Sequence, residues 1–202
     1  MSHACGMGDE VKPEVVKLMM LLKAKGLAQG YSGVTIETVE KLIELFNHEI
    51  YPVIWEVGSL GASGDLAPLA HLTLPLIGKG SVRYKNEKRN AADVLTELKI
   101  SAIKLKAKEG LALLNGTQFM SAWGCYALLE AERVEKLADF TAAVSVDAFD
   151  AQTNPFHPAI QKVRNHKGQI DSAKNVLRFL AGSEIAKQEK ENSADKKIKI
   201  NF

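Results

Sequence analysis

The 202-residue sequence predicts a mainly α-helical protein with one short β-hairpin. Apolar residues recur at the helical spacing of three and four in most of the chain. The longest such segment runs from near Thr117 to about Phe149. A helix of roughly thirty residues spans about 45 Å, more than a compact domain of this size needs, so we expect neighbours in a bundle. Residues 79–89 alternate apolar and polar side chains as a short hairpin does.

The first two helices follow from apolar spacing and from proline and glycine. Pro13 is well placed in a first helical turn, and the apolar residues after it predict a helix to about Gln29. Residues 29–33 are typical of a turn. The residues from Ile36 to Phe46 place their apolar side chains on one face, so we expect a second, amphipathic helix that ends before Pro52.

The later elements follow from similar patterns. Residues 66–77 are apolar nearly all round, which predicts a buried helix kinked at Pro75. The composition becomes charged from Glu184 onward, so we divide the chain into residues 1–183 and a disordered tail, 184–202. We also expect a short helix at 91–98, an extended piece at 100–106, a loop at 153–158 and short helices at 159–164 and 171–180.

Composition excludes several classes of function. A net charge of +2 gives no argument for binding nucleic acid or an anionic membrane surface. We see no pattern of a secretory signal in the first residues and no apolar run near the ~18 residues of a membrane span, so we expect neither. Cys5 and Cys125 lie far apart and in no metal-ligand spacing. We therefore expect a cytoplasmic protein with reduced thiols, no bound metal, and no nucleic-acid or membrane partner.

The residues from Val57 to Leu69 form the candidate functional segment. Its glycines permit a very tight loop. In such a loop the amide nitrogen of Gly64 can attack the carbonyl carbon of Ala62, and loss of two waters, one carrying the Ser63 hydroxyl, leaves a methylidene-imidazolone. A plainer alternative is an ordinary helix start with Ser63 or Asp65 as the N-cap. The loop lacks the Lys-Ser/Thr ending of a nucleotide-binding loop.

Five stretches of this sequence resemble one family. Gly-Ala-Ser-Gly-Asp-Leu-Ala-Pro-Leu-Ala-His, at residues 61–71, is similar to the signature of the aromatic amino acid ammonia-lyases, most of all of their histidine-type members. Residues 2–6 (Ser-His-Ala-Cys-Gly) resemble the segment whose Ser-His pair marks the histidine-type substrate pocket. Residues 108–118 resemble the family's Gly-Leu-Ala-Leu-Ile-Asn-Gly-Thr-Gln segment, and Pro155-Phe156 and residues 166–169 match further landmarks. The resemblance covers residues 2 to about 191.

The resemblance implies a fold, a reaction and a site. It implies part of the helical ammonia-lyase-like fold, elimination of ammonia from L-histidine to give urocanate, and a homotetramer. The catalytic residues would be Ala62, Ser63 and Gly64, which form the methylidene-imidazolone without an external cofactor, and Asn115, which contacts this group and the substrate. His3 would bind the substrate ring.

Two family segments have no counterpart in this sequence. The family carries one catalytic tyrosine upstream of the matched region and, downstream, a second tyrosine with the arginine for the substrate carboxylate. At the downstream position this chain reads Glu-Asn-Ser-Ala-Asp-Lys-Lys at residues 191–197. We therefore expect weak or no turnover from this chain alone. The alternatives are a non-catalytic helical remnant of the family and a tyrosine- or phenylalanine-type lyase. His71 and His166 are expected to be structural.

Overall fold

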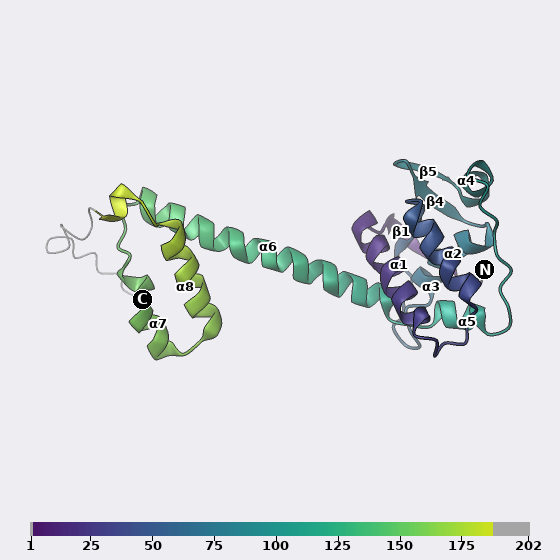
Figure 1. The fold of residues 1–202 in the computed structure, drawn as a ribbon, viewed down its shortest axis with the longest axis horizontal. Coiled ribbons are helices and arrows are strands. Elements are labelled where there is room, and N and C mark those ends of the chain that lie inside the picture. The colour runs from purple at the N-terminus through teal and green to yellow at the C-terminus, as the bar shows by residue number, and fades with distance from the viewer. Residues whose placement is uncertain (1, 188–202) are drawn as a thin grey trace. The chain divides into compact units, whose positions relative to one another are not determined.

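The computed structural model describes residues 2–187 (Figure 1). The chain divides into two compact units, residues 1–128 and residues 129–202, and helix α6 (Gln118–Ala148) contributes residues to both. The predicted division at residue 183 stays a prediction. Most of the predicted tail, residues 188–202, lies outside the described residues, whereas residues 184–187 are helical.

The first unit combines helices with two small sheets, and the predicted mainly helical fold class is confirmed. Its helices and strands are β1 (Met7–Glu10), α1 (Pro13–Ala28), α2 (Ile36–Asn47), β2 (Tyr51–Pro52), β3 (Trp55–Val57), α3 (Ala67–Thr73), the 3₁₀ helix η1 (Leu74–Ile77), β4 (Ser81–Tyr84), β5 (Glu87–Asn90), α4 (Ala91–Glu97), α5 (Glu109–Leu114) and the first turns of α6.

The predicted hairpin forms from β4 and β5. Tyr84 lies opposite Glu87, so the turn consists of Lys85 and Asn86, whose φ angles are 50° and 65°. Two consecutive positive φ values are the geometry of a two-residue hairpin turn that matches the twist of the strands. Strand β2 pairs antiparallel with the other edge of β4, which completes a three-stranded sheet in the order β2-β4-β5.

A second pair of strands, β1 and β3, has no counterpart in the predictions. The two strands are antiparallel, with Met7 opposite Val57 and Glu10 opposite Trp55, and a register irregularity lies between these pairs. The pairing fixes the N-terminal segment beside the residues that lead into the glycine-rich loop. It therefore places two of the predicted functional stretches next to each other.

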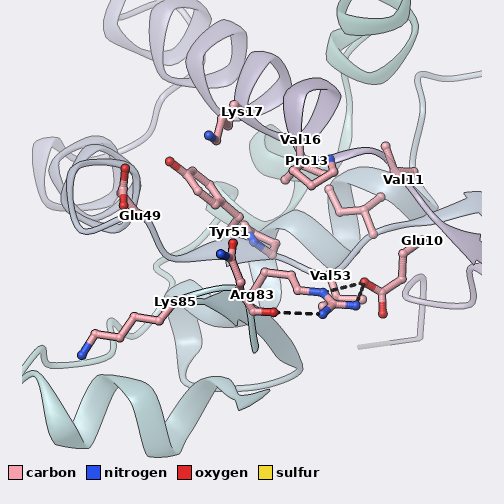
Figure 2. A pocket seen from close by; sticks show the side chains of 13 residues that line it. Glu10, Val11, Pro13, Val16, Lys17, Glu49, Tyr51, Val53, Arg83 and Lys85 are labelled. Atoms are coloured by element: carbon pink, nitrogen blue, oxygen red, sulfur yellow. Dashed lines mark hydrogen bonds and ion pairs between the residues drawn. The ribbon is translucent and has the colours of Figure 1, made fainter. Parts of the chain in front are cut away.

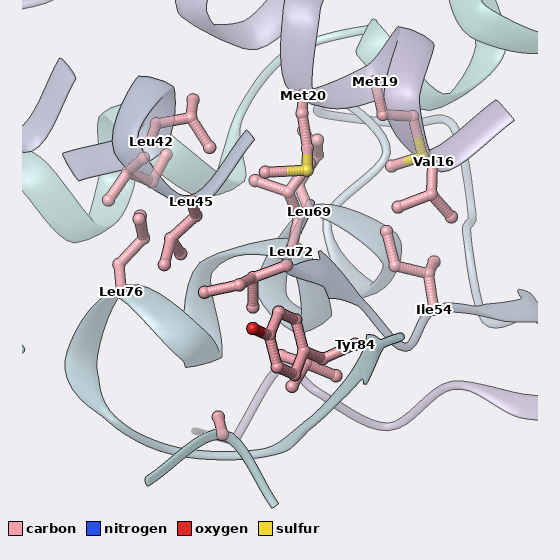
Figure 3. Close-up of a cluster of buried hydrophobic side chains, with 14 of the residues drawn as sticks. Val16, Met19, Met20, Leu42, Leu45, Ile54, Leu69, Leu72, Leu76 and Tyr84 are labelled. Carbon is pink, nitrogen blue, oxygen red and sulfur yellow. The ribbon is translucent and has the colours of Figure 1, made fainter. Parts of the chain in front are cut away.

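The hydrophobic core lies between α1, α2, α3, η1 and β4 (Figure 3). Helices α1 and α2 lie side by side (Figure 1). The residues predicted as a buried, kinked helix form α3, which changes to 3₁₀ geometry at Leu74, next to Pro75. Gly78, with a φ of 68°, ends this element in the left-handed conformation. The fully buried side chains that Figure 3 labels include Met19, Met20, Leu42, Leu45, Leu69, Leu72 and Leu76.

The extended piece predicted at residues 100–106 is not a strand. These residues are all described, and they form no ladder with another strand. Ile100 and Ile103 are nevertheless buried, and the amide of Ile103 donates to the carbonyl of Leu76 at 2.9 Å. The apolar alternation therefore reflects side chains that cover the core from a connecting segment.

The second unit contains the later part of α6, η2 (Asn154–Phe156), α7 (Pro158–Arg164) and α8 (Lys167–Phe179). Helix α8 starts four residues before the predicted Asp171, because Asn165 ends α7 in the left-handed conformation and His166 is extended. Within the unit, the buried Asp139 on α6 accepts hydrogen bonds from Ser172 and, at 2.8 Å, from Asn175 on α8. These bonds join the two helices.

Candidate active site

The predicted functional loop connects β3 to α3 and is held close to neighbouring backbone. A Cβ atom added at Gly58, whose φ is 136°, would lie 3.1 Å from the Cα of Gly6. Leu66, immediately before α3, has a φ of 40°, a value that a bulky residue adopts only under constraint from its surroundings. Between these positions Ala62 and Ser63 are exposed. The loop is thus anchored at both ends and open at its centre.

Gly64 lies directly against the Asn115–Gly116 peptide. A Cβ atom at Gly64 would lie 2.6 Å from the nitrogen and 2.8 Å from the oxygen of Gly116, and 3.4 Å from the carbonyl carbon of Asn115. Only glycine fits this contact. The adjacent amide of Asp65 donates to the Gly116 oxygen at 2.8 Å. The structure therefore brings together the two stretches predicted to carry the chemistry, Ala62–Gly64 and Asn115.

The side chain of Asn115 is engaged on its own helix. Its Nδ2 donates to the carbonyl of Leu111 at 2.9 Å, and the residue is half-buried at the end of α5. An asparagine side chain offers both a donor and an acceptor, so the amide oxygen is a second group that a ligand could use. The predicted role of Asn115 stays a prediction.

Asp65 caps α6, and the interpretation of Ser63 or Asp65 as the N-cap of the next helix is wrong. The N-cap position of α3 is Leu66, which makes no side-chain cap. The Asp65 carboxylate is buried, and its Oδ2 accepts from the amides of Phe119 at 2.7 Å and Met120 at 3.3 Å. These amides belong to the first turn of α6, whose donors have no partner within the helix. The loop is therefore tied to α6 as well as to α5.

The N-terminal segment reaches the loop through β1 and β3. The Gly6 amide donates to Nε2 of His71 at 3.0 Å, and a Cβ at Gly6 would lie 2.9 Å from the Cβ of Trp55. Burial lowers the pKa of His71, which agrees with a neutral ring that accepts at Nε2. His71 thus has a backbone partner within the fold, and its predicted structural role stays a prediction. His3 is exposed, with its Nδ1 3.4 Å from the Ser2 hydroxyl, and its predicted role stays a prediction.

Glu109 is a buried carboxylate that the sequence analysis does not identify. Its Oε1 accepts from the Thr35 amide and hydroxyl, both at 2.8 Å, and from the Thr38 hydroxyl at 2.9 Å. Its Oε2 accepts from the Lys106 amide at 2.7 Å. Burial alone would raise the pKa of Glu109, but these hydrogen bonds outweigh it and hold the pKa at about 2. The carboxylate links the start of α2 to α5, the helix that ends at Asn115.

A cavity of about 580 Å³ lies away from the loop, between α1, β2 and β4 (Figure 2). Its cationic and aromatic side chains already have partners. Arg83 donates to Glu10 at 3.0 Å, and the amine of Lys17 lies 4.8 Å from the centre of the Tyr51 ring. None of the predicted site residues lines the cavity. The predicted site residues therefore lie outside this cavity.

Two further features bear on the class of site. Among residues 2–187, no three His, Cys, Asp or Glu side chains gather in a way that could hold a metal ion. The same residues include no helix with the length and apolar character needed to cross a membrane.

Comparison with known proteins identifies relatives of the whole described chain. A family model described as aromatic amino acid lyase matches residues 1–198. A histidine ammonia-lyase of Caldanaerobacter subterraneus is 50% identical over 185 residues, which are 92% of this chain and 36% of that protein. The chain thus spans about a third of the length of the curated relatives it matches.

Solved structures agree with these sequence relatives. The histidine ammonia-lyase of Trypanosoma cruzi matches with a TM-score of 0.81 and 41% identity, over 87% of this chain and 34% of that one. A tyrosine aminomutase of Streptomyces globisporus matches with a TM-score of 0.86 and 32% identity, over 99% of this chain and 39% of that one. The same backbone arrangement thus occurs in proteins named for different amino acids.

Proposed function

The chain belongs to the aromatic amino acid lyase family, and on this basis we propose that it acts as a histidine ammonia-lyase. The proposed reaction of the whole protein is elimination of ammonia from L-histidine to give urocanate. Identities near 50% to histidine ammonia-lyases over more than nine-tenths of the chain support this substrate over the alternatives. A cytoplasmic location is part of the proposal and agrees with the free thiols of Cys5 and Cys125.

The close contact of Gly64 with the Asn115–Gly116 peptide is the observation that carries the proposal. Ala62 and Gly64 would close the ring of a methylidene-imidazolone, and Ser63 would supply its methylidene carbon. Once formed, this group supplies an electrophile without any external cofactor. The residues fit it, because Gly64 has no side chain to block its amide nitrogen, and Ala62 and Ser63 are open to a substrate.

The remaining proposed roles belong to side chains near the loop. Asn115 would release Leu111 and hydrogen-bond the substrate amine or the oxygen of the prosthetic group. His3 would hydrogen-bond the substrate imidazole, since its segment is held beside the loop by the Gly6–Gly58 contact. We assign neither the base for the β-proton nor the carboxylate clamp to a residue of this chain.

Intact mass measurement tests the proposed prosthetic group. We expect the purified chain to weigh two waters less than its sequence requires, with the deficit in the peptide that contains residues 62–64. Ser63→Ala should abolish the deficit, because alanine has no hydroxyl to eliminate. Ser59→Ala, in the same loop, is the matched control and should keep it. An unmodified mass in the wild type would favour the non-catalytic remnant.

Substrate preference needs a separate assay. We would incubate the whole protein with L-histidine, L-tyrosine and L-phenylalanine and follow the unsaturated product and the released ammonia. Urocanate formation from L-histidine alone agrees with the proposal. A preference for L-tyrosine would move the chain to the tyrosine type, whose fold relatives include the tyrosine aminomutase.

We also propose a homo-oligomer, for which the family tetramer is the expectation. The support is a set of exposed apolar side chains on α6. Val134, Leu137 and Val144 are 63%, 61% and 50% exposed, and their spacing of three and seven residues places them along one side of the helix. Such a stripe is typical of a helix that packs against others. Sedimentation velocity of the wild type and of Leu137→Lys tests it, with loss of the larger species expected for the variant.

A further inference from the structure

Lys23, in the middle of α1, is a buried cation with no part in the proposed chemistry. Its side chain is 2% exposed, although a buried ammonium is unfavourable unless each of its protons has an acceptor. Its Nζ donates to the carbonyl of Ala112 at 2.8 Å, to that of Asn115 at 3.2 Å and to Oε1 of Gln118 at 3.4 Å. Three donors therefore meet three acceptors.

These three acceptors lie on residues around the Asn115–Gly116 peptide, which is in close contact with Gly64. Ala112 and Asn115 lie at the end of α5, and Gln118 is the first residue of α6. Gly116 lies between them and accepts the hydrogen bond from the Asp65 amide. The last carbonyls of a helix lack a donor from a following turn of that helix, so those of Ala112 and Asn115 need a donor from elsewhere. Lys23, on α1, supplies that donor.

We propose that Lys23 is a positioning residue for the Ala62-Ser63-Gly64 loop, because it holds residues 112–118 where Gly116 contacts Gly64. The proposal rests on the function proposed for that loop. Without the amine, the Asn115 carbonyl loses its buried donor and the Gly116 peptide can turn away, which opens the contact that closes the loop. The hydrogen bonds of Lys23 go to residues 112–118, so it would act on the loop through that segment.

The electrostatic surroundings agree with this arrangement. Burial lowers the pKa of Lys23 to about 8, and the carboxylate of Asp65 opposes that shift. The three atoms that accept its hydrogen bonds are uncharged oxygens. The cation is thus held by directed hydrogen bonds to the 112–118 segment.

Hydrogen exchange on the purified chain tests the proposal. Lys23→Met keeps an unbranched apolar stem but removes every donor. We expect exchange of the Asp65 amide to accelerate about tenfold or more. Exchange of the Ile103 amide, which bonds to Leu76 elsewhere in the unit, should stay near the wild-type rate. Lys23→Arg should restore most of the Asp65 protection, because a guanidinium also donates to carbonyls. Lys25→Met, at an exposed position of the same helix, is the matched control and should change neither amide.

Three outcomes bear on the proposal in different ways. Selective acceleration at Asp65 supports it, and equal acceleration at Asp65 and Ile103 overturns it in favour of a general structural role. Unchanged exchange at Asp65 also overturns it. The mass of the same samples reports on the loop separately. A wild type that loses no water refutes the function proposed for the loop, and the exchange pattern still decides whether Lys23 positions it.

A measurement on the wild type covers the case in which Lys23→Met does not fold. The ¹³C shifts of the Ala112 and Asn115 carbonyls should titrate together with a midpoint near the Lys23 pKa of about 8. Lys23→Arg should remove this titration, because a guanidinium stays charged over that range. Carbonyl shifts of Ala112 and Asn115 that do not follow the titration of the Lys23 amine, whatever its midpoint, would overturn the proposal.

Discussion

Replacement of Glu109 by glutamine tests how strongly one carboxylate holds α2 to α5. Its two oxygens accept four hydrogen bonds, and two of the donors are backbone amides that cannot turn away. If the glutamine oxygen stays with Thr35 and Thr38, its NH₂ group faces the Lys106 amide, donor against donor. One orphaned buried donor, together with the loss of charge from three remaining bonds, gives a destabilisation of about 2–4 kcal/mol.

Urea unfolding followed by circular dichroism measures this change. For a slope of about 2 kcal/mol per molar urea, the expected loss lowers the midpoint by about 1–2 M. Glu97→Gln is the control, because Glu97 forms a partly exposed ion pair with Arg89 at 2.8 Å, and loss of such a solvated pair should change the midpoint little. A Glu109→Gln midpoint within experimental error of the wild type would refute the assignment of a strong buried network.

Three further predictions use the same unit. The pKa of Glu109 is about 2 in the folded chain and ordinarily 4.5, so the unfolded state binds more protons than the folded state between these pH values. The free energy of unfolding should therefore fall as the pH drops from 4.5 to about 2. Urea midpoints of Glu109→Gln should depend less on pH than those of the wild type. Gly64→Ala should prevent the loss of two waters, because the new Cβ would lie 2.6 Å from the Gly116 nitrogen, and a mass deficit in that variant would contradict the contact. Asp65→Ala should lower the free energy of unfolding by about 1–2 kcal/mol through loss of the cap on Phe119, as judged by urea midpoints.

The helices and the hairpin could be predicted because their signals are local. Pro13 marks the start of α1, and Pro75 marks the change to 3₁₀ geometry. The strands β1 and β3 could not be predicted. They are four and three residues long, too short to show alternation, and they pair only because the chain folds back across many residues.

The sequence predicted the residues proposed to carry the chemistry, but it predicted few of the residues that hold the loop in place. The Ala62–Gly64 tripeptide carries its signal in its own residues. Asp65 caps α6, whose Phe119 lies 54 residues further along the chain. Nothing in the sequence near Asp65 shows that it caps α6 and not α3, the helix that follows it directly. The position of Lys23 in the sequence does indicate that it is unusual. It lies four residues after Met19 and four before Leu27, on the buried side of α1, where a lysine is unusual.

The tie between Asp65 and α6 also sets an order of events in time. The amide of Phe119 exists as a partner only after some fifty further residues have been synthesised, and the segment between them must close as one large loop. During synthesis the loop therefore lacks this support until Phe119 has been added to the chain. Any chemistry that depends on its folded geometry begins only after residues 109–120 have packed against it. Formation of the prosthetic group would then indicate that residues 109–120 have packed against the loop.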